Sequence, residues 1–132
     1  MPVTVSDAQD LGSAPQVSVT PDTSPSGLEV EDLVVGSGKE AGPTDTVSVQ
    51  YLGVHIHDGS EFDSSWSRGG RPASFPLGQV VAGFRDGISG MREGGRRVLV
   101  VPPEMGYGAQ GAPPAIGRNE PLVFVVDLVS IR

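Results

Sequence analysis

Apolar and polar residues alternate at the start of the stretch Leu28–Val35, LEVEDLVV, and this alternation predicts a β-strand. A longer β-branched run, TVSVQYLGV, follows at Thr46–Val54 and predicts a second strand. Its period of two places Val47, Val49 and Tyr51 on one face. The pattern therefore indicates a sheet with at least one buried face.

The rest of the chain adds shorter extended segments and one helix. Four further strands are expected, at Phe62–Trp66, Ala73–Leu77, Arg96–Pro102 and Leu122–Ile131. The stretch Val80–Ile88, VVAGFRDGI, is the one segment with helical character, and the two glycines within it predict that the helix is short. A Pro- and Gly-rich loop from Pro103 to about Arg118 precedes the last strand.

The order of these elements does not alternate as βαβ units. One short helix covers one face of a mostly antiparallel sheet, so we predict the α+β class. A single helix cannot fill the concave side of a twisted sheet, and aromatic side chains are expected to line the space that remains. The candidates for this lining are Tyr51, Phe62, Trp66, Phe75, Phe84 and Tyr107.

The first 27 residues differ in composition from the rest. They are rich in Ser, Thr, Pro and Asp, and residues 21–27, PDTSPSG, have a composition typical of a linker or turn. We therefore predict a flexible or loosely packed N-terminal extension over residues 1–27 and one domain over residues 28–132. Val17 and Val19 alternate with polar residues, so a short piece of the extension can pack along the domain.

Composition and charge narrow the possible functions. The formal net charge of −7 argues against nucleic acid as the main partner, because phosphate binding needs a basic surface. The chain has no cysteine, which rules out a thiolate metal site and fits a reducing cytoplasm. No stretch approaches the roughly 20 apolar residues of a membrane-spanning helix. We expect a cytoplasmic monomer with no membrane partner; a signal-stripped extracytoplasmic form is the alternative.

The residues also bear on two other kinds of site, a phosphate-binding loop and a metal site. Neither a G-x-x-x-x-G-K-[ST] loop nor a G-x-G-x-x-G turn after a strand occurs, so a phosphate-binding loop has no support. His55 and His57 share a face of their strand, where Asp58 or Glu61 could complete a zinc site. The alternative, which we favour, is that the two histidines belong to a polar outer face at the end of a hairpin. We expect no metal and no cofactor.

Three blocks of sequence stand in order along the chain. They are VQYLG with EFDSS at 49–53 and 61–65, FPLG running through VVAGF to Gly87-Ile88 at 75–88, and VPPEMGYGA with LVF at 101–109 and 122–124. In this order and spacing they closely resemble the FKBP-type peptidyl-prolyl isomerases, the immunophilins that bind tacrolimus and rapamycin. The resemblance implies a curled antiparallel sheet of five or six strands wrapped around one short helix, and an enzyme that accelerates rotation about X–Pro bonds.

The resemblance also implies the residues of the pocket. Those with an expected catalytic role are Tyr51, Phe62, Asp63 and Tyr107. Those expected to contact the substrate are Phe75, Val80, Val81, Phe84, Ile116 and Phe124, the last serving the core more than the contact. Asp63 is expected to accept a hydrogen bond from Tyr51 and to set an electrostatic gradient across the twisting amide. The Tyr107 hydroxyl is expected to donate to a substrate carbonyl.

Two positions depart from the family's pattern. The floor of the pocket, usually tryptophan, is Phe84, and a second wall aromatic of some relatives is Ala73. Both changes predict a wider pocket, less suited to tacrolimus or rapamycin than to prolyl turnover. The substrates implied are proline-containing peptides and unfolded or folding proteins. A proline-motif binding module with incidental catalysis is the alternative. The chain lacks the chaperone insertion that some bacterial relatives carry near the Tyr107 loop, which argues against a holdase-like folding helper.

Overall fold

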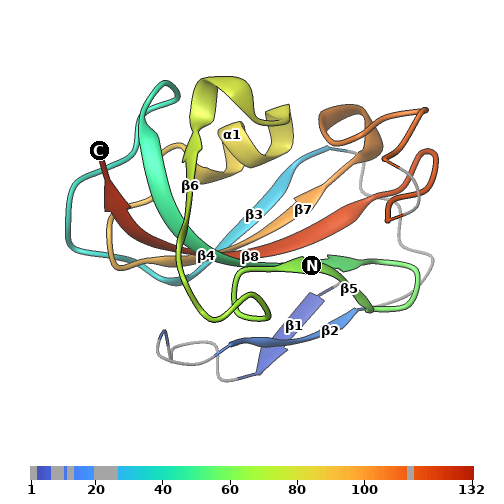
Figure 1. The fold of residues 1–132 in the computed structure, drawn as a ribbon, viewed down its shortest axis with the longest axis horizontal. Coiled ribbons are helices and arrows are strands. Elements are labelled where there is room, and N and C mark those ends of the chain that lie inside the picture. The colour runs from blue at the N-terminus through green and yellow to red at the C-terminus, as the bar shows by residue number, and fades with distance from the viewer. Residues whose placement is uncertain (1–2, 7–10, 12–13, 20–26, 113–114) are drawn as a thin grey trace.

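A six-stranded antiparallel sheet forms the centre of the structure, a computed structural model that describes residues 3–6, 11, 14–19, 27–112 and 115–132. Its strands are β3 (Glu29–Val34), β4 (Thr46–His55), β5 (Glu61–Ser64), β6 (Ala73–Pro76), β7 (Arg96–Val101) and β8 (Leu122–Ile131). The order across the sheet is β3-β7-β8-β4-β5, and β6 pairs with the remaining part of β4. Helix α1 (Ala82–Ile88) lies against one side of this curled sheet (Figure 1). The predicted α+β class is therefore confirmed.

The central strands bury side chains on both of their faces. In β7, Leu99 and Val101 belong to the apolar cluster that contains α1, whereas Val98 and Val100 belong to a second cluster behind the sheet. Successive side chains of a strand point to opposite faces, so these neighbours separate as the period of two requires. Because both faces are covered, β4, β7 and β8 are buried along most of their length, including the polar Ser48 and Gln50 of β4.

A small hairpin covers the second face of the sheet. Strands β1 (Val3–Ser6) and β2 (Gln16–Val19) pair with each other, and their valines contact the cluster behind the sheet. The hairpin lies on the opposite side of the sheet from α1 (Figure 1). The described part of the expected N-terminal extension thus packs through Val17 and Val19, while its linker segment at 21–26 lies outside the described residues.

Trp66 also packs against this second cluster. The expectation that it lines the pocket is therefore wrong. Strand β5 ends at Ser64, whose hydroxyl accepts a hydrogen bond from the Trp66 backbone N–H at 3.1 Å. The turn that begins there breaks the alternation of the strand and directs the indole to the other face.

Helix α1 begins two residues later than the sequence indicated. Val80 and Val81 keep extended backbones, with ψ of 171° and 150°, and Val81 is the residue that precedes the first helical turn. Gly83 and Gly87 face β7, and a Cβ atom added at Gly83 would lie 2.4 Å from Cγ1 of Val101. The glycines thus keep the helix short and also let it approach the sheet closely, so that the Phe84 ring lies between the helix and the sheet.

Among the described residues, no helix has the length and apolarity needed to cross a bilayer.

Candidate active site: an aromatic pocket

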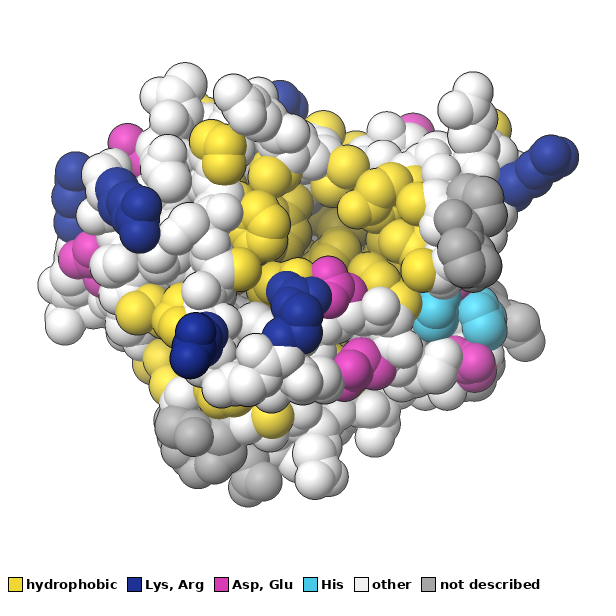
Figure 2. All heavy atoms as spheres, viewed as in Figure 1, with side chains coloured by type: hydrophobic (Ala, Val, Ile, Leu, Met, Phe, Trp, Pro, Cys, Tyr) yellow, Lys and Arg dark blue, Asp and Glu magenta, His cyan; other side chains and the backbone are white. Residues whose placement is uncertain are grey.

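A hollow lined by apolar side chains opens between α1, the sheet and the loop before β8 (Figure 2). Its cavity volume is about 250 Å³, close to the lower end of the roughly 300–1,000 Å³ usual for ligand pockets. The residues that line it are Tyr51, Phe62, Asp63, Phe75, Gln79, Val80, Val81, Phe84, Tyr107 and Phe124. These residues come from β4, β5, β6, β8, α1 and the segments beside them, so the pocket forms only when these elements have come together.

The floor of the pocket is a set of aromatic rings packed edge to face. The Phe84 ring centroid lies 5.5 Å from that of Phe75 and 5.3 Å from that of Phe124, with interplanar angles of 74° and 76°. Tyr51 completes the group, 5.7 Å from Phe75 and 6.2 Å from Phe84. Edge-to-face pairs of this kind are favourable beyond the area they bury, so each ring fixes its neighbours. The floor is therefore preorganised.

The wall formed by Phe62 depends on a glycine that the sequence did not single out. The ring lies over Gly53 of β4, where an added Cβ atom would approach the Phe62 Cζ atom to 2.6 Å. Phe62 also meets Phe124 edge to face at 5.6 Å. Gly53 therefore makes room for the ring, and any larger residue there would push Phe62 toward the pocket.

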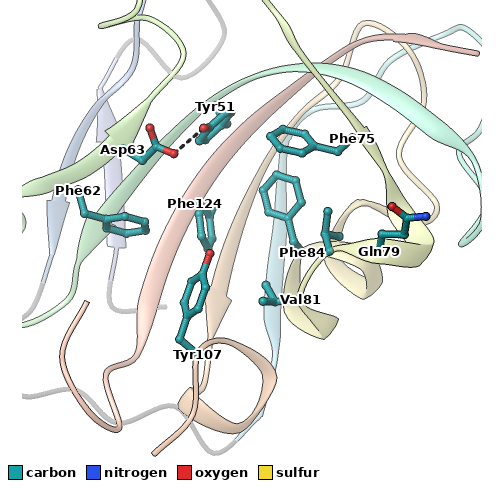
Figure 3. Close-up of a pocket in the computed structure, with 10 residues that line it drawn as sticks. Tyr51, Phe62, Asp63, Phe75, Gln79, Val81, Phe84, Tyr107 and Phe124 are labelled. Carbon is teal, nitrogen blue, oxygen red and sulfur yellow. Dashed lines mark hydrogen bonds between the residues drawn. The ribbon is translucent and has the colours of Figure 1, made fainter. Parts of the chain in front are cut away.

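A polar network closes one edge of the pocket. The Tyr51 hydroxyl donates to Oδ2 of Asp63 at 2.6 Å, as expected from the sequence (Figure 3). Arg68 was not expected: it pairs with Oδ1 of Asp63, and its Nη2 donates to the Tyr51 hydroxyl oxygen at 2.7 Å. Burial raises the pKa of Tyr51, and the Asp63 carboxylate adds to this effect while Arg68 opposes it. The phenol therefore stays protonated and holds its hydrogen bond at neutral pH.

Two polar groups on the opposite rim have no hydrogen-bond partner among the described residues. Tyr107 rises from the loop between the 3-10 helix η2 (Pro103–Met105) and β8, is 40% exposed, and directs its hydroxyl into the pocket (Figure 3). Within the part of the chain that the structure describes, neither this hydroxyl nor the Val81 backbone N–H makes a hydrogen bond. Both groups are therefore available to a ligand.

The structure brings together all the residues predicted for the site except Ile116. This isoleucine is buried in the core cluster and does not line the pocket. Phe124 both lines the pocket and packs in the core. Gln79, which no motif indicated, joins the lining beside Val80. The lining offers a single carboxylate, already bound by Tyr51 and Arg68, so the arrangement favours binding through shape and hydrogen bonds over covalent chemistry.

Comparison with known proteins agrees with this site. Residues 37–129 match the model of the family described as FKBP-type peptidyl-prolyl cis-trans isomerase. The chain is 46% identical over 117 residues to a probable FK506-binding protein of Corynebacterium glutamicum, covering 88% of this chain and 97% of the relative. It is 42% identical over 120 residues to an FK506-binding protein of Streptomyces anulatus, with 89% and 96% covered.

Solved structures agree as well. The crystal structure of FkpA from Escherichia coli superposes with a TM-score of 0.75 at 40% identity, over 83% of this chain and 51% of that one. The family match spans most of the chain and includes every residue of the aromatic pocket. The chain therefore belongs to the FKBP-type peptidyl-prolyl cis-trans isomerase family and is an enzyme that catalyses rotation about X–Pro bonds.

Proposed function

We propose that the aromatic pocket accelerates this rotation without covalent chemistry, by favouring the twisted amide over the planar one. Amide resonance gives the planar bond a barrier of about 18–20 kcal/mol, and uncatalysed X–Pro exchange takes tens to hundreds of seconds. The planar amide is the more dipolar state, and water stabilises it through hydrogen bonds to the carbonyl oxygen. An apolar pocket stabilises it less, so the barrier falls. A decrease of about 5–6 kcal/mol corresponds to roughly 10⁴-fold acceleration.

The observation that carries this proposal is the preorganised floor of Tyr51, Phe75, Phe84 and Phe124. Such a floor holds the proline ring in place while the preceding carbonyl rotates. The free rim groups, the Tyr107 hydroxyl and the Val81 N–H, would hold substrate carbonyls beside the rotating bond. Binding energy from the fixed groups then restricts the substrate to conformations close to the transition state.

The polar edge has a second role in the proposal. Asp63 holds the Tyr51 phenol and the Arg68 guanidinium, so a negative and a positive charge lie next to each other at one side of an apolar cavity. Charges at the rim of an apolar site act more strongly than they do in water. Their field would favour one direction of twist of the amide. Asp63 is thus proposed as an electrostatic and positioning group that transfers no proton.

The partners follow from the same chemistry. FKBP-type proteins bind proline-containing substrates and FK506-type ligands. For this chain we propose exposed X–Pro segments of unfolded or folding proteins as substrates, with tacrolimus and rapamycin as candidate inhibitors. The acidic charge supports the absence of nucleic acid among its partners. The monomeric state and the cytoplasmic location are proposed on the sequence alone, the latter on the lack of cysteine.

Tyr107→Phe tests the hydrogen bond proposed for the rim. The variant keeps the ring and loses the hydroxyl, so the affinity for an X–Pro peptide should fall by about 0.5–1.5 kcal/mol, the net contribution of one hydrogen bond. Calorimetric titration of a short X–Pro peptide measures this change. Because Tyr107 is substantially exposed, the variant should unfold at the same temperature as the unchanged protein. An unchanged affinity would show that the hydroxyl does not bind the substrate.

A further inference from the structure

A second group of side chains with metal-binding chemistry lies at the rim of the pocket. His55 is the last residue of β4, His57 follows in the turn after it, and Glu120 comes from the loop before β8. The chain has only two histidines, and Figure 2 shows both side by side at the edge of the apolar hollow. The His55 and Glu120 side chains are 12% and 10% exposed, whereas His57 is 60% exposed. The group is therefore anchored on one side and open to solvent on the other.

The three side chains bring their donor atoms close together. Each offers one nitrogen or oxygen, and these atoms all lie within 4.8 Å of one another. The Nε2 atom of His57 is 3.2 Å from Oε1 of Glu120, and Nδ1 of His55 contacts the same oxygen. Zinc ligands lie about 2.0–2.2 Å from the metal in a tetrahedron, which places them about 3.3 Å apart. The separation between His57 and Glu120 already matches this value.

The fold holds two of these side chains in place. His55 pairs with Leu122 across β4 and β8, so Glu120, two residues before Leu122, is brought next to it by the register of the sheet. The second carboxylate oxygen of Glu120 accepts a hydrogen bond from the Gly117 N–H at 2.6 Å, and the His55 ring packs against Phe62 at 5.2 Å. Groups that orient metal ligands in this way are a usual part of metal sites.

We propose that His55, His57 and Glu120 bind one divalent transition-metal ion, for which Zn²⁺ is the best match. Two imidazole nitrogens and one carboxylate oxygen suit zinc and its neighbours, whereas calcium and magnesium prefer oxygen ligands alone. Three protein ligands leave a fourth position, which the exposed side of His57 opens to water. The sequence suggested Asp58 or Glu61 as the carboxylate; the structure supplies Glu120 from 65 residues away along the chain.

A metal ion bound at this position would affect the loop that forms one side of the pocket. Glu120 belongs to the loop that carries Tyr107, and within this loop the Asn119 N–H donates to the Gly108 carbonyl at 2.9 Å. A metal bridge would join this loop to the end of β4. The bound ion should therefore restrain the Tyr107 side of the pocket and raise the thermal unfolding temperature, because a ligand that binds only the folded state stabilises it.

Calorimetric titration of the tag-free full-length chain with ZnCl₂ tests the site, with CaCl₂ as the comparison. We expect saturable one-to-one binding of zinc and none of calcium. His57→Gln and Glu120→Gln should each weaken zinc binding by at least about tenfold, since loss of an orienting group alone costs 10–100-fold. Glu61→Gln, a nearby carboxylate that accepts a hydrogen bond from Ser67, is the matched control and should bind zinc unchanged.

Imidazole NMR gives an independent measurement, because both histidine signals of this chain are expected to shift together on zinc addition. The absence of saturable zinc binding would overturn the proposal, and so would zinc binding that survives both ligand variants. Equal binding of calcium and zinc would also overturn it, since that outcome indicates non-specific attraction to acidic groups. His57→Gln changes an exposed side chain, so the test does not depend on a buried substitution.

Discussion

Replacing Asp63 by alanine is expected to lower kcat/KM for an X–Pro peptide by about 10–100-fold. The carboxylate accepts the Tyr51 hydroxyl and pairs with Arg68, so its removal frees both groups at the edge of the pocket. A loss of about 1.4–2.7 kcal/mol of transition-state stabilisation corresponds to this range of rates. The side chain is partly exposed, so the free energy of unfolding should change little. NMR exchange rates and urea unfolding measure the two effects separately.

Asp63→Asn removes the negative charge of this side chain and keeps its shape. The amide keeps an oxygen that can accept from Tyr51 but carries no charge to pair with Arg68. If the charge sets the field across the amide, the asparagine variant should lose nearly as much activity as the alanine variant. If both variants turn over within twofold of the unchanged enzyme, the role assigned to Asp63 is wrong.

Asp127→Asn is expected to lower the free energy of unfolding by about 3–5 kcal/mol. Arg96 and Asp127 face each other across β7 and β8, with side chains 0% and 5% exposed. Nε and Nη2 of Arg96 donate to the two carboxylate oxygens at 2.6 and 2.8 Å. Burial raises the pKa of Asp127, and these two bonds oppose that effect. Loss of the carboxylate charge removes the counter-charge that Asp127 provides to a fully buried guanidinium, a large cost for a domain whose total stability is about 5–15 kcal/mol.

The neighbouring residue in β7 provides the control. Arg97 pairs with Asp32 at 2.6 Å, with the same bidentate chemistry, but Asp32 is exposed. Asp32→Asn should therefore cost no more than about 1 kcal/mol, as exposed ion pairs do. Urea unfolding of both variants measures the difference. Equal midpoints for the two would contradict the importance given to the buried pair.

Local patterns predicted most of the secondary structure. Alternation in Thr46–Val54 and the apolar run before Pro102 located β4 and β7 to within about one residue, because buried strands need apolar side chains along their length. The start of α1 was misplaced, since Val80 and Val81 continue the apolar pattern while their backbones stay extended. The hairpin β1–β2 was only partly anticipated, since four-residue strands carry little periodic signal.

The aromatic lining was expected from the α+β pattern, but Asp63, Val80, Val81 and Phe124 were assigned to the pocket only through the resemblance to a family. The remaining partners of these residues come from folding. Arg68 lies five residues after Asp63 in a Ser- and Gly-containing turn, and no sequence motif indicated that it would pair with this carboxylate. Glu120 meets His55 through the register of β4 against β8, which periodicity does not determine. Gly53 is needed because of a ring from the neighbouring strand. Each of these contacts depends on which strands pair, and one sequence by itself does not show that.

The most direct test of the proposed mechanism is NMR exchange spectroscopy on a short X–Pro peptide with a catalytic amount of the protein. Cis–trans exchange cross-peaks are expected at rates far above the uncatalysed exchange, which takes tens to hundreds of seconds, and Asp63→Ala should reduce these rates markedly. Peptide signals that shift on binding while exchange stays at the uncatalysed rate would contradict the proposed mechanism. That result would identify the pocket as a proline-binding module without turnover.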